Sequence, residues 1–515
     1  MKSIFLKAVS VVTLLTIVSK LLGFVREAFI ANYFGTSIEA DAYFIASLIP
    51  MMIFTVIGSA ISTGIIPLYV SQKKQNEEHA NKIIGIVATL FTLVSIFISA
   101  LCWIFAENIT LLMAPGFSEE QIELTAYLVR LMIFASIFFV LSAFATGVLH
   151  ANKKFAAPAA VTIVNNAIII VALITLTDKY GVTGLAIGTM LGISSQFFIQ
   201  YPQFKAYNIK PSIEIAKYKD DVKKYILVIL PIIVSSVFSQ INKVVDRIIA
   251  SDLPTGSISA LNYANKLLYL PLSVIIMAFV TVLYPYLIDA LEESKQKFME
   301  LALKGIRLIT YISIPILVVM LISKNELVAL AFGRGEFTKE AETMTTIAFF
   351  YYSVGMIFIA TKTYLFQCLY ALKRVNITIM TSVVFIMMNM GLSIWLSNYL
   401  AHGGIALATS IAMLCHSITL TIILFKINKG MTKVRPFIVD QIKMLILFTI
   451  VFGLSAMSME WFDIQVGFFK ITLNTFITFV LFYIFSFLLK MTEMTTIIDL
   501  IKRKVLKKLG LPSSF

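Results

Sequence analysis

Ten ionisable side chains fall inside apolar stretches of the sequence that are long enough to cross a membrane. Seven are cations: Lys20, Arg26, Arg130, Lys243, Arg247, Lys266 and Lys362. Three are acids: Glu27, Asp41 and Asp246. A charge at the centre of a membrane helix costs about 2.5–3.5 kcal/mol, so we expect these groups to face a wet cavity or one another. The excess of cations favours an anionic ligand such as a pyrophosphate, which lysine and arginine bind through charge-assisted hydrogen bonds.

These charges divide into two predicted sets. The substrate-binding set consists of Lys20, Arg26, Arg247, Lys266 and Lys362. The coupling or gating set consists of Asp41, Glu27 and Asp246. Structural roles are the alternative: Arg247 could reach the outer interface, and Arg26 could pair with Asp41. Asn262 could bind sugar hydroxyls or join helices, and Asn166 is predicted to form an interhelical hydrogen bond.

The composition indicates that the apolar stretches which contain these charges lie in a membrane. Of 515 residues, 59% are hydrophobic and only 14% are charged, whereas soluble proteins have about 25% charged residues. The chain is therefore predicted to be an all-α polytopic membrane protein. The three cysteines are scattered, so neither a disulfide framework nor a metal site is expected.

A helix needs about 20 apolar residues to cross a bilayer. The sequence contains fourteen such stretches, at approximately 6–32, 41–70, 83–106, 121–149, 156–177, 182–204, 225–250, 258–288, 305–323, 343–371, 376–398, 404–425, 437–458 and 467–489. With both termini inside, the net charge of +14 divides into +18 on inner segments, −8 on outer loops and +4 within the spans. The positive-inside rule then predicts that both termini are cytoplasmic. The positive charge is thus a membrane signature, and no nucleic-acid partner is expected.

An internal repeat organises the spans. Residues recur at offsets of 220 or 221: Arg26, Gly35 and Pro50 with Arg247, Gly256 and Pro271; Phe117-Ser118 with Phe337-Thr338; Lys153-Lys154 with Lys373-Arg374; and Gly184 with Gly404. Each copy holds six spans, which predicts two lobes related by an axis along the membrane normal, at 1–215 and 216–430. Residues 431–515 add two helices and a basic cytoplasmic tail.

The sequence has no catalytic motif such as GxSxG or HExxH, and it has no ATP-binding loop. It is therefore not expected to be an enzyme. We expect no cofactor, and transport would be downhill or would depend on the membrane potential or a monovalent cation.

Several motifs together resemble one family. They are Ser19-Lys20-Leu21-Leu22-Gly23-Phe24-Val25-Arg26-Glu27, Phe34-Gly35, Asp41-Ala42-Tyr43-Phe44 with Pro50, Ala114-Pro115-Gly116-Phe117, and Asn262-Tyr263-Ala264-Asn265-Lys266-Leu267. Over roughly residues 5–425 the chain is similar to the MurJ (MviN-type) lipid II flippases of the MOP superfamily, which also contains the MATE exporters. The resemblance implies a cationic cavity between two lobes and alternating access that carries lipid II outward across the bacterial cytoplasmic membrane for peptidoglycan synthesis. It also implies a groove for the lipid tail at the last two helices, and cell-wall synthesis enzymes as further partners.

By this resemblance, Lys20, Arg26, Asp41 and Lys266 match cavity residues of the family, and Lys362 matches an intramembrane lysine. The chain also departs from the pattern. Lysine stands at positions 20 and 266 where the family usually has arginine, and the family's paired arginines fall on Phe54 and Thr55. The Glu-Gly-Ala that follows in the family reads Gly58-Ser59-Ala60 here.

These departures leave alternatives for the cargo and for the function. A flippase for lipid-linked repeat units of capsule, exopolysaccharide or O-antigen is the nearest. A cation-coupled drug exporter of the MATE type would use Asp41, Glu27 and Asp246 for coupling, but the +4 interior disfavours cationic drugs. A non-transporting scaffold would gain little from so many buried charges.

Overall fold

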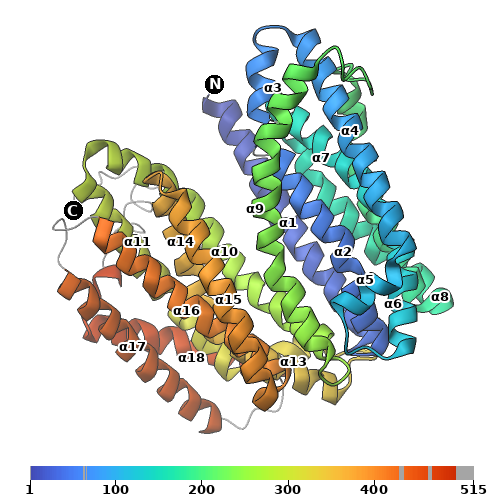
Figure 1. The fold of residues 1–515 in the computed structure, drawn as a ribbon. Helices are drawn as coiled ribbons and strands as arrows, with labels where there is room; N and C mark the ends of the chain where they lie inside the picture. The colour runs from blue at the N-terminus through green and yellow to red at the C-terminus, as the bar shows by residue number, and fades with distance from the viewer. Residues whose placement is uncertain (1, 62–63, 65, 428–433, 462–466, 495–515) are drawn as a thin grey trace. The chain divides into compact units, whose positions relative to one another are not determined.

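The computed structural model describes residues 2–61, 64, 66–427, 434–461 and 467–494, and within these ranges every regular element is a helix (Figure 1). The predicted basic tail lies mostly outside the described residues. The helices are α1 (Lys2–Phe34), α2 (Ile38–Ala60), α3 (Ile66–Lys73), α4 (Glu77–Ile104), α5 (Ala106–Met113), α6 (Glu119–Met132), α7 (Ala135–Ala151), α8 (Ala156–Lys205), α9 (Lys219–Ser251), α10 (Ser257–Glu293), α11 (Lys295–Ile322), α12 (Lys324–Phe332), α13 (Lys339–Val354), α14 (Met356–Ala371), α15 (Val375–Leu400), α16 (His402–Ile427), α17 (Val434–Trp461) and α18 (Gly467–Leu488).

In the described part of the chain all fourteen predicted spans overlap helices, and residues 62, 63 and 65 of the predicted span 41–70 lie outside it. By length and composition, eight helices of the described residues can cross a membrane, and the bent pairs α6–α7 and α13–α14 each qualify when counted as one span. The other four predicted spans fall on α1, α9, α10 and the second half of α8. Helix α8 holds two spans because its backbone turns at Gly181, where φ is 54°. The predicted all-α membrane architecture is confirmed.

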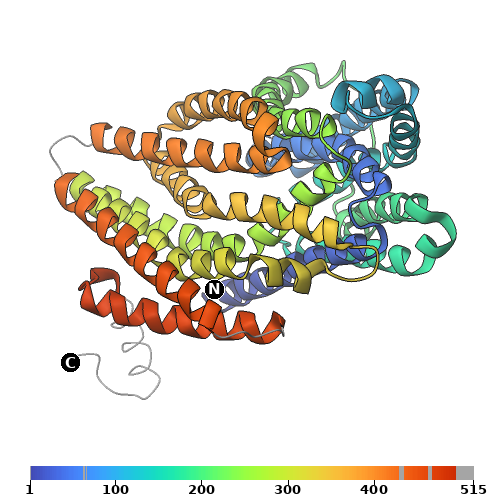
Figure 2. The same ribbon diagram turned by 90° about the horizontal axis from the view of Figure 1, so that it is seen from below.

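The chain forms two compact units. Unit 1 comprises Met1–Tyr263 and Arg334–Ala341, and unit 2 comprises Ala264–Gly333 and Glu342–Phe515. In unit 1, α8 packs against α1 and α7, while α2 packs against α6 and α9 (Figure 1). In unit 2, α11 packs against α14, α17 and α18, and α15 packs against α16 (Figure 2).

Each unit has an aromatic and aliphatic core. In unit 1, Tyr69, Phe144 and Tyr225 are buried together between helices. In unit 2, Tyr311 of α11 contacts Phe482 of α18, with ring centroids 4.7 Å apart. Without water in the hydrocarbon region, such packing and interhelical hydrogen bonds hold the helices together.

The predicted repeat is visible in the local backbone. Helices α6 and α7 are bent by 42°, and their counterparts α13 and α14 by 45°. The hydroxyl of Ser118 accepts a hydrogen bond from the N–H three residues on at the start of α6, and Thr338 does the same before α13. Both are N-caps, which satisfy helix N–H groups that have no partner within the helix.

Positive φ angles recur at the same offset. Lys153 and Lys373 have φ of 60° and 58°, each just after a bent pair. Gly181 and Ala401 have φ of 54° and 46°, each between two long helices. These angles are disfavoured for residues with a Cβ atom, so the two halves of the chain require the same unusual turns.

Two glycines of unit 1 bring chain segments into backbone contact. The N–H of Gly116 donates to Ser251 Oγ over 3.2 Å, and a Cβ at Gly116 would lie 2.5 Å from the Ser251 carbonyl oxygen. One position before the counterpart of Gly116 in the second half, a Cβ at Gly335 would overlap the Asn32 carbonyl oxygen, which accepts from Glu336 N–H over 2.9 Å. Only glycine allows backbones to approach this closely.

Candidate functional site

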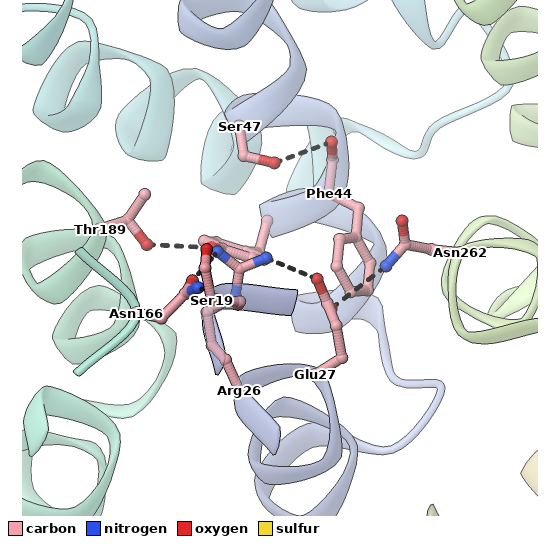
Figure 3. A network of polar contacts seen from close by, with 9 residues as sticks. Ser19, Arg26, Glu27, Phe44, Ser47, Asn166, Thr189 and Asn262 are labelled. Carbon is pink, nitrogen blue, oxygen red and sulfur yellow. Dashed lines mark hydrogen bonds and ion pairs between the residues drawn. The ribbon is translucent and has the colours of Figure 1, made fainter. Parts of the chain in front are cut away.

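Arg26 and Glu27, neighbours on α1, form an ion pair in unit 1 (Figure 3). Arg26 Nη2 lies 2.7 Å from Glu27 Oε1, and the two side chains are 18% and 2% exposed. Burying either charge alone would be costly, so each stabilises the other at this depth. Of the predicted site residues, Glu27 rather than Asp41 is therefore the ion-pair partner of Arg26.

Two asparagines from distant parts of the chain complete this charged cluster. Asn166 Oδ1 on α8 accepts from Arg26 Nη1 over 3.1 Å, and its amide donates to the Ser19 carbonyl over 3.3 Å. Asn262 on α10 donates to Glu27 Oε2 over 3.3 Å (Figure 3). Asn166 thus forms the interhelical hydrogen bonds that were predicted, and it also orients the guanidinium.

The guanidinium keeps donor capacity beyond this cluster. The bonds to Asn166 and Glu27 use two of the five N–H donors that an arginine carries in a fixed plane, and the side chain is 18% exposed. A cation held rigidly by a carboxylate and an amide, with a donor to spare, is suited to an anion such as a phosphate oxygen.

Asp41, on α2, is not part of this cluster, and its carboxylate contacts the N-terminus of α10. Its carboxylate accepts from the N–H of Gly256 over 2.7 Å and from that of Ser259 over 2.8 Å. These are the N-cap and N3 positions of α10, where a negative charge is favourable. Beside them, Arg247 Nη1 donates to the Ile258 carbonyl over 2.9 Å.

The remaining predicted residues lie in other places. Lys20 is exposed on α1, and Asp246 is partly buried on α9, both in unit 1. Lys266 on α10 and Lys362 on α14 belong to unit 2. Lys362 Nζ lies 4.8 Å from the centre of the Phe366 ring, a cation–π contact. Among the described residues, no group of three or more His, Cys, Asp or Glu side chains could hold a metal ion.

Sequence reasoning did not find the partners of Asp41. The sequence did contain a local indication of this site. Gly256-Ser257 precedes a long apolar stretch, and such residues are typical of the N-cap region of a helix. It also missed the contact of Tyr43, whose hydroxyl lies 2.9 Å from Thr189 Oγ1 between α2 and α8.

The family model described as "Lipid II flippase MurJ" matches residues 30–494 of this chain. The chain belongs to the lipid II flippase MurJ family. Two curated relatives, both named probable lipid II flippase MurJ, are from Buchnera aphidicola (29% identical, covering 79% of this chain and 80% of the relative) and Rickettsia prowazekii (30% identical, covering 78% and 80%).

A solved structure agrees with this assignment. A lipid II flippase MurJ in an inward closed conformation matches with a TM-score of 0.79 and 25% identity, covering 92% of this chain and 97% of that one. A MATE transporter of the MOP superfamily in an inward-facing conformation matches with a TM-score of 0.65, covering 80% and 96%. At 13% identity that second match shows the fold alone.

One departure from the MurJ pattern has a structural counterpart. At the second of the two positions where the resemblance places arginines, Thr55 Oγ1 donates to the Met51 carbonyl over 2.9 Å, within α2. This hydroxyl is satisfied by its own helix, and it supplies no positive charge where the resemblance implies one.

Proposed function

We propose that this protein is a flippase that moves a polyprenyl-pyrophosphate-linked saccharide, lipid II, from the inner to the outer leaflet of the bacterial cytoplasmic membrane. The observation that carries the proposal is the Arg26–Glu27–Asn166 cluster inside a chain that matches the MurJ family over residues 30–494. The protein acts as a transporter and catalyses no covalent chemistry. Cell-wall synthesis enzymes, which use the flipped lipid, are its expected partners.

Arg26 contributes directed hydrogen bonds to the pyrophosphate in this mechanism. Glu27 and Asn166 fix the plane of its guanidinium, so little side-chain entropy is lost when the anion binds. Lys20, Arg247, Lys266 and Lys362 supply further positive charge to the path of the head group. The polyprenyl tail stays in the bilayer beside α17 and α18, so its apolar surface is not exposed to water.

Alternating access of two lobes, residues 1–215 and 216–430, carries the head group outward, with both chain termini on the cytoplasmic side. An inside-negative membrane potential can drive or reset the cycle, since moving one charge across it is worth about 2.3 kcal/mol per 100 mV. A monovalent cation bound at Asp246 or Glu27 is the alternative source of coupling. Flipping in sealed vesicles with an imposed potential or a sodium gradient separates the two.

The test combines complementation of a strain depleted of its lipid II flippase with flipping of labelled lipid II in proteoliposomes. Arg26→Gln should abolish both activities per molecule of folded protein; activity is compared on folded protein because the change also leaves the buried Glu27 carboxylate without its counter-charge. Arg130→Gln is the matched control, because Arg130 forms a more exposed ion pair with Glu107 over 2.9 Å. Full activity of Arg26→Gln in both assays would contradict the proposal.

Thr55 favours one second candidate, a flippase for a different lipid-linked saccharide. Without the arginine of the family at this position, the chain has one fewer cation for the lipid II head group. Failure to rescue the depleted strain, together with rescue of a strain lacking a capsule or O-antigen flippase, would support this cargo. Thr55→Arg should then improve complementation by lipid II flipping.

A further inference from the structure

A cavity of about 820 Å³ lies in unit 2 and is lined by residues of that unit alone. It is lined by the start of α12, residues 342–351 of α13 and the junction between α15 and α16. The charge distribution of the loops predicts that these segments face the outside of the cell. Its volume is within the range of small-molecule sites in proteins.

One wall of this cavity carries a hydroxyl that no described group satisfies. Thr346 on α13 is only 7% exposed, it lines the cavity, and its Oγ1 has no hydrogen-bond partner in the described part of the chain. Buried hydroxyls nearly always have a partner, because an unmade hydrogen bond costs free energy. The oxygen itself is buried, so a ligand with a donor or acceptor would satisfy it once the side chain turns about its Cα–Cβ bond toward the cavity.

The lining of the cavity combines opposite charges. Lys324 Nζ lies 4.3 Å from the centre of the Phe350 ring, which holds the ammonium by a cation–π contact. Glu342 contributes a carboxylate to the same cavity, and Asn325 contributes an amide. A simple anion would be repelled by Glu342 and a simple cation by Lys324. A neutral ligand with many hydroxyl groups can donate to one and accept from the other.

Aromatic rings line the cavity beside these polar groups. Tyr399 is 73% exposed at the end of α15, and Tyr351 lies on α13. Such faces carry partial negative charge and attract the C–H groups of a sugar ring. Apolar faces alternating with hydroxyl, amide and charged groups therefore match the surface of a saccharide better than that of a lipid tail.

The cavity has a rigid frame. A Cβ on Gly403 would lie 3.0 Å from the Tyr351 ring, so α16 packs directly on that side chain. Ser410 Oγ donates to the Tyr351 carbonyl over 2.6 Å, and His402 Nε2 lies 2.8 Å from the Met344 carbonyl oxygen. Ala401, in the lining, has φ of 46°, which few residues with a Cβ adopt. The surrounding structure must hold this turn, and preorganisation of this kind favours binding.

We propose that this cavity is a saccharide-binding site on the outer side of the protein, distinct from the intramembrane cationic path. The inference rests on the proposed function in one respect: the bound saccharide is the head group of the flipped lipid, held before it leaves. In the bound state the Thr346 side chain turns toward the cavity and its Oγ1 bonds a hydroxyl or acetamido group, while Tyr351 and Tyr399 contact the ring.

Binding of the soluble disaccharide N,N′-diacetylchitobiose tests this proposal. The protein is placed in lipid nanodiscs, because maltoside detergents carry a saccharide of their own, and saturation-transfer NMR reports the contact. Thr346→Val removes one hydroxyl at nearly constant volume and should weaken binding roughly three- to tenfold. Thr345→Val is the matched control: Thr345 is fully buried with an unpartnered Oγ1 on the same helix, but it does not line the cavity. The Thr345→Val variant should bind the disaccharide with the same affinity as the wild-type protein.

Absence of disaccharide binding to the wild-type protein overturns the inference, and so does an equal loss of affinity in the two valine variants. Lipid II flipping by the same preparations keeps the proposals apart. Flipping without disaccharide binding rejects the outer site alone. Disaccharide binding that survives in Arg26→Gln, while flipping is lost, supports two separate sites.

Discussion

Asp41 accepts a hydrogen bond from the backbone N–H of Gly256 across 2.7 Å, although the two residues lie 215 positions apart in the chain. Together with the bond from Ser259, it gives α10 an N-terminal cap supplied by α2. An acid that a transporter could use for ion coupling therefore has a structural task in this conformation. The two roles predict different consequences of mutation.

As a cap, Asp41 contributes to stability. Asp41→Ala leaves two buried N–H groups without an acceptor and should destabilise the protein by about 1–3 kcal/mol. Asp41→Asn keeps one acceptor oxygen and should lose less. The midpoint of thermal unfolding in detergent measures both, with Glu39→Gln on the same turn of α2 as an exposed control. An Asp41→Asn variant with an unchanged midpoint and no transport would instead assign coupling to this carboxylate.

The ion pair of Arg26 and Glu27 should show strong coupling in a double-mutant cycle. Glu27→Gln leaves a cation that is only 18% exposed without its counter-charge, which should cost about 3 kcal/mol. Adding Arg26→Gln removes that charge and should restore about 1–3 kcal/mol of the loss. Denaturation midpoints of the four proteins measure the interaction. Additive effects would mean that the pair contributes nothing to folding.

The close backbone contacts at Gly116 and Gly335 should not tolerate a methyl group. Gly116→Ala and Gly335→Ala force apart the segments that meet Ser251 and Asn32, and each should lower the thermal midpoint. Gly391→Ala, within α15, is the control, since a Cβ there meets nothing within 4 Å. Alanine favours helix more than glycine does, so this control should be neutral or stabilising by up to about 1 kcal/mol. Equal behaviour of all three variants would argue against the contacts.

Gly181 and Ala401 lie in two equivalent turns with similar φ angles. We therefore expect exchange of glycine and alanine to have opposite effects on stability at the two positions. Ala401→Gly relieves a φ of 46° and should stabilise unit 2 by about 1 kcal/mol. Gly181→Ala introduces the same strain at φ of 54° in unit 1 and should destabilise it by a similar amount. Thermal unfolding of the two variants measures the difference. Destabilisation by Ala401→Gly would show that the methyl group packs favourably enough to outweigh the strain.

A pH-dependent anchor joins α4 to the segment before α9. Lys82 Nζ lies 2.7 Å from Glu214 Oε1, and this bond lowers the pKa of Glu214 below its ordinary value of 4.5. A lowered carboxyl pKa stabilises the anchor above pH 4.5, and that contribution is lost as the pH falls through the folded pKa. Limited proteolysis of residues 206–218 should therefore accelerate below pH 4.5. Glu214→Gln should be cleaved faster at pH 7, with less change on acidification.

Hydropathy and residue spacing were sufficient to predict the positions of the helices and the internal repeat. A run of about 20 apolar residues can satisfy its backbone only as a helix in lipid, whatever the rest of the chain does. Turns such as Lys153-Lys154 and Lys373-Arg374 are likewise local, so their recurrence could be recognised from the printed residues. The predicted lobe boundaries at 215 and 430 remain predictions.

Pairing between helices could not be predicted in this way. Whether Arg26 bonds Glu27 or Asp41 depends on which face of α1 meets α8 and α10, and Asn262 reaches Glu27 from 235 residues away. The unpartnered hydroxyl of Thr346 likewise follows from how α13 packs beside the α15–α16 junction. Helix formation depends on near neighbours in the chain, whereas burial and hydrogen-bond partners depend on packing between distant segments.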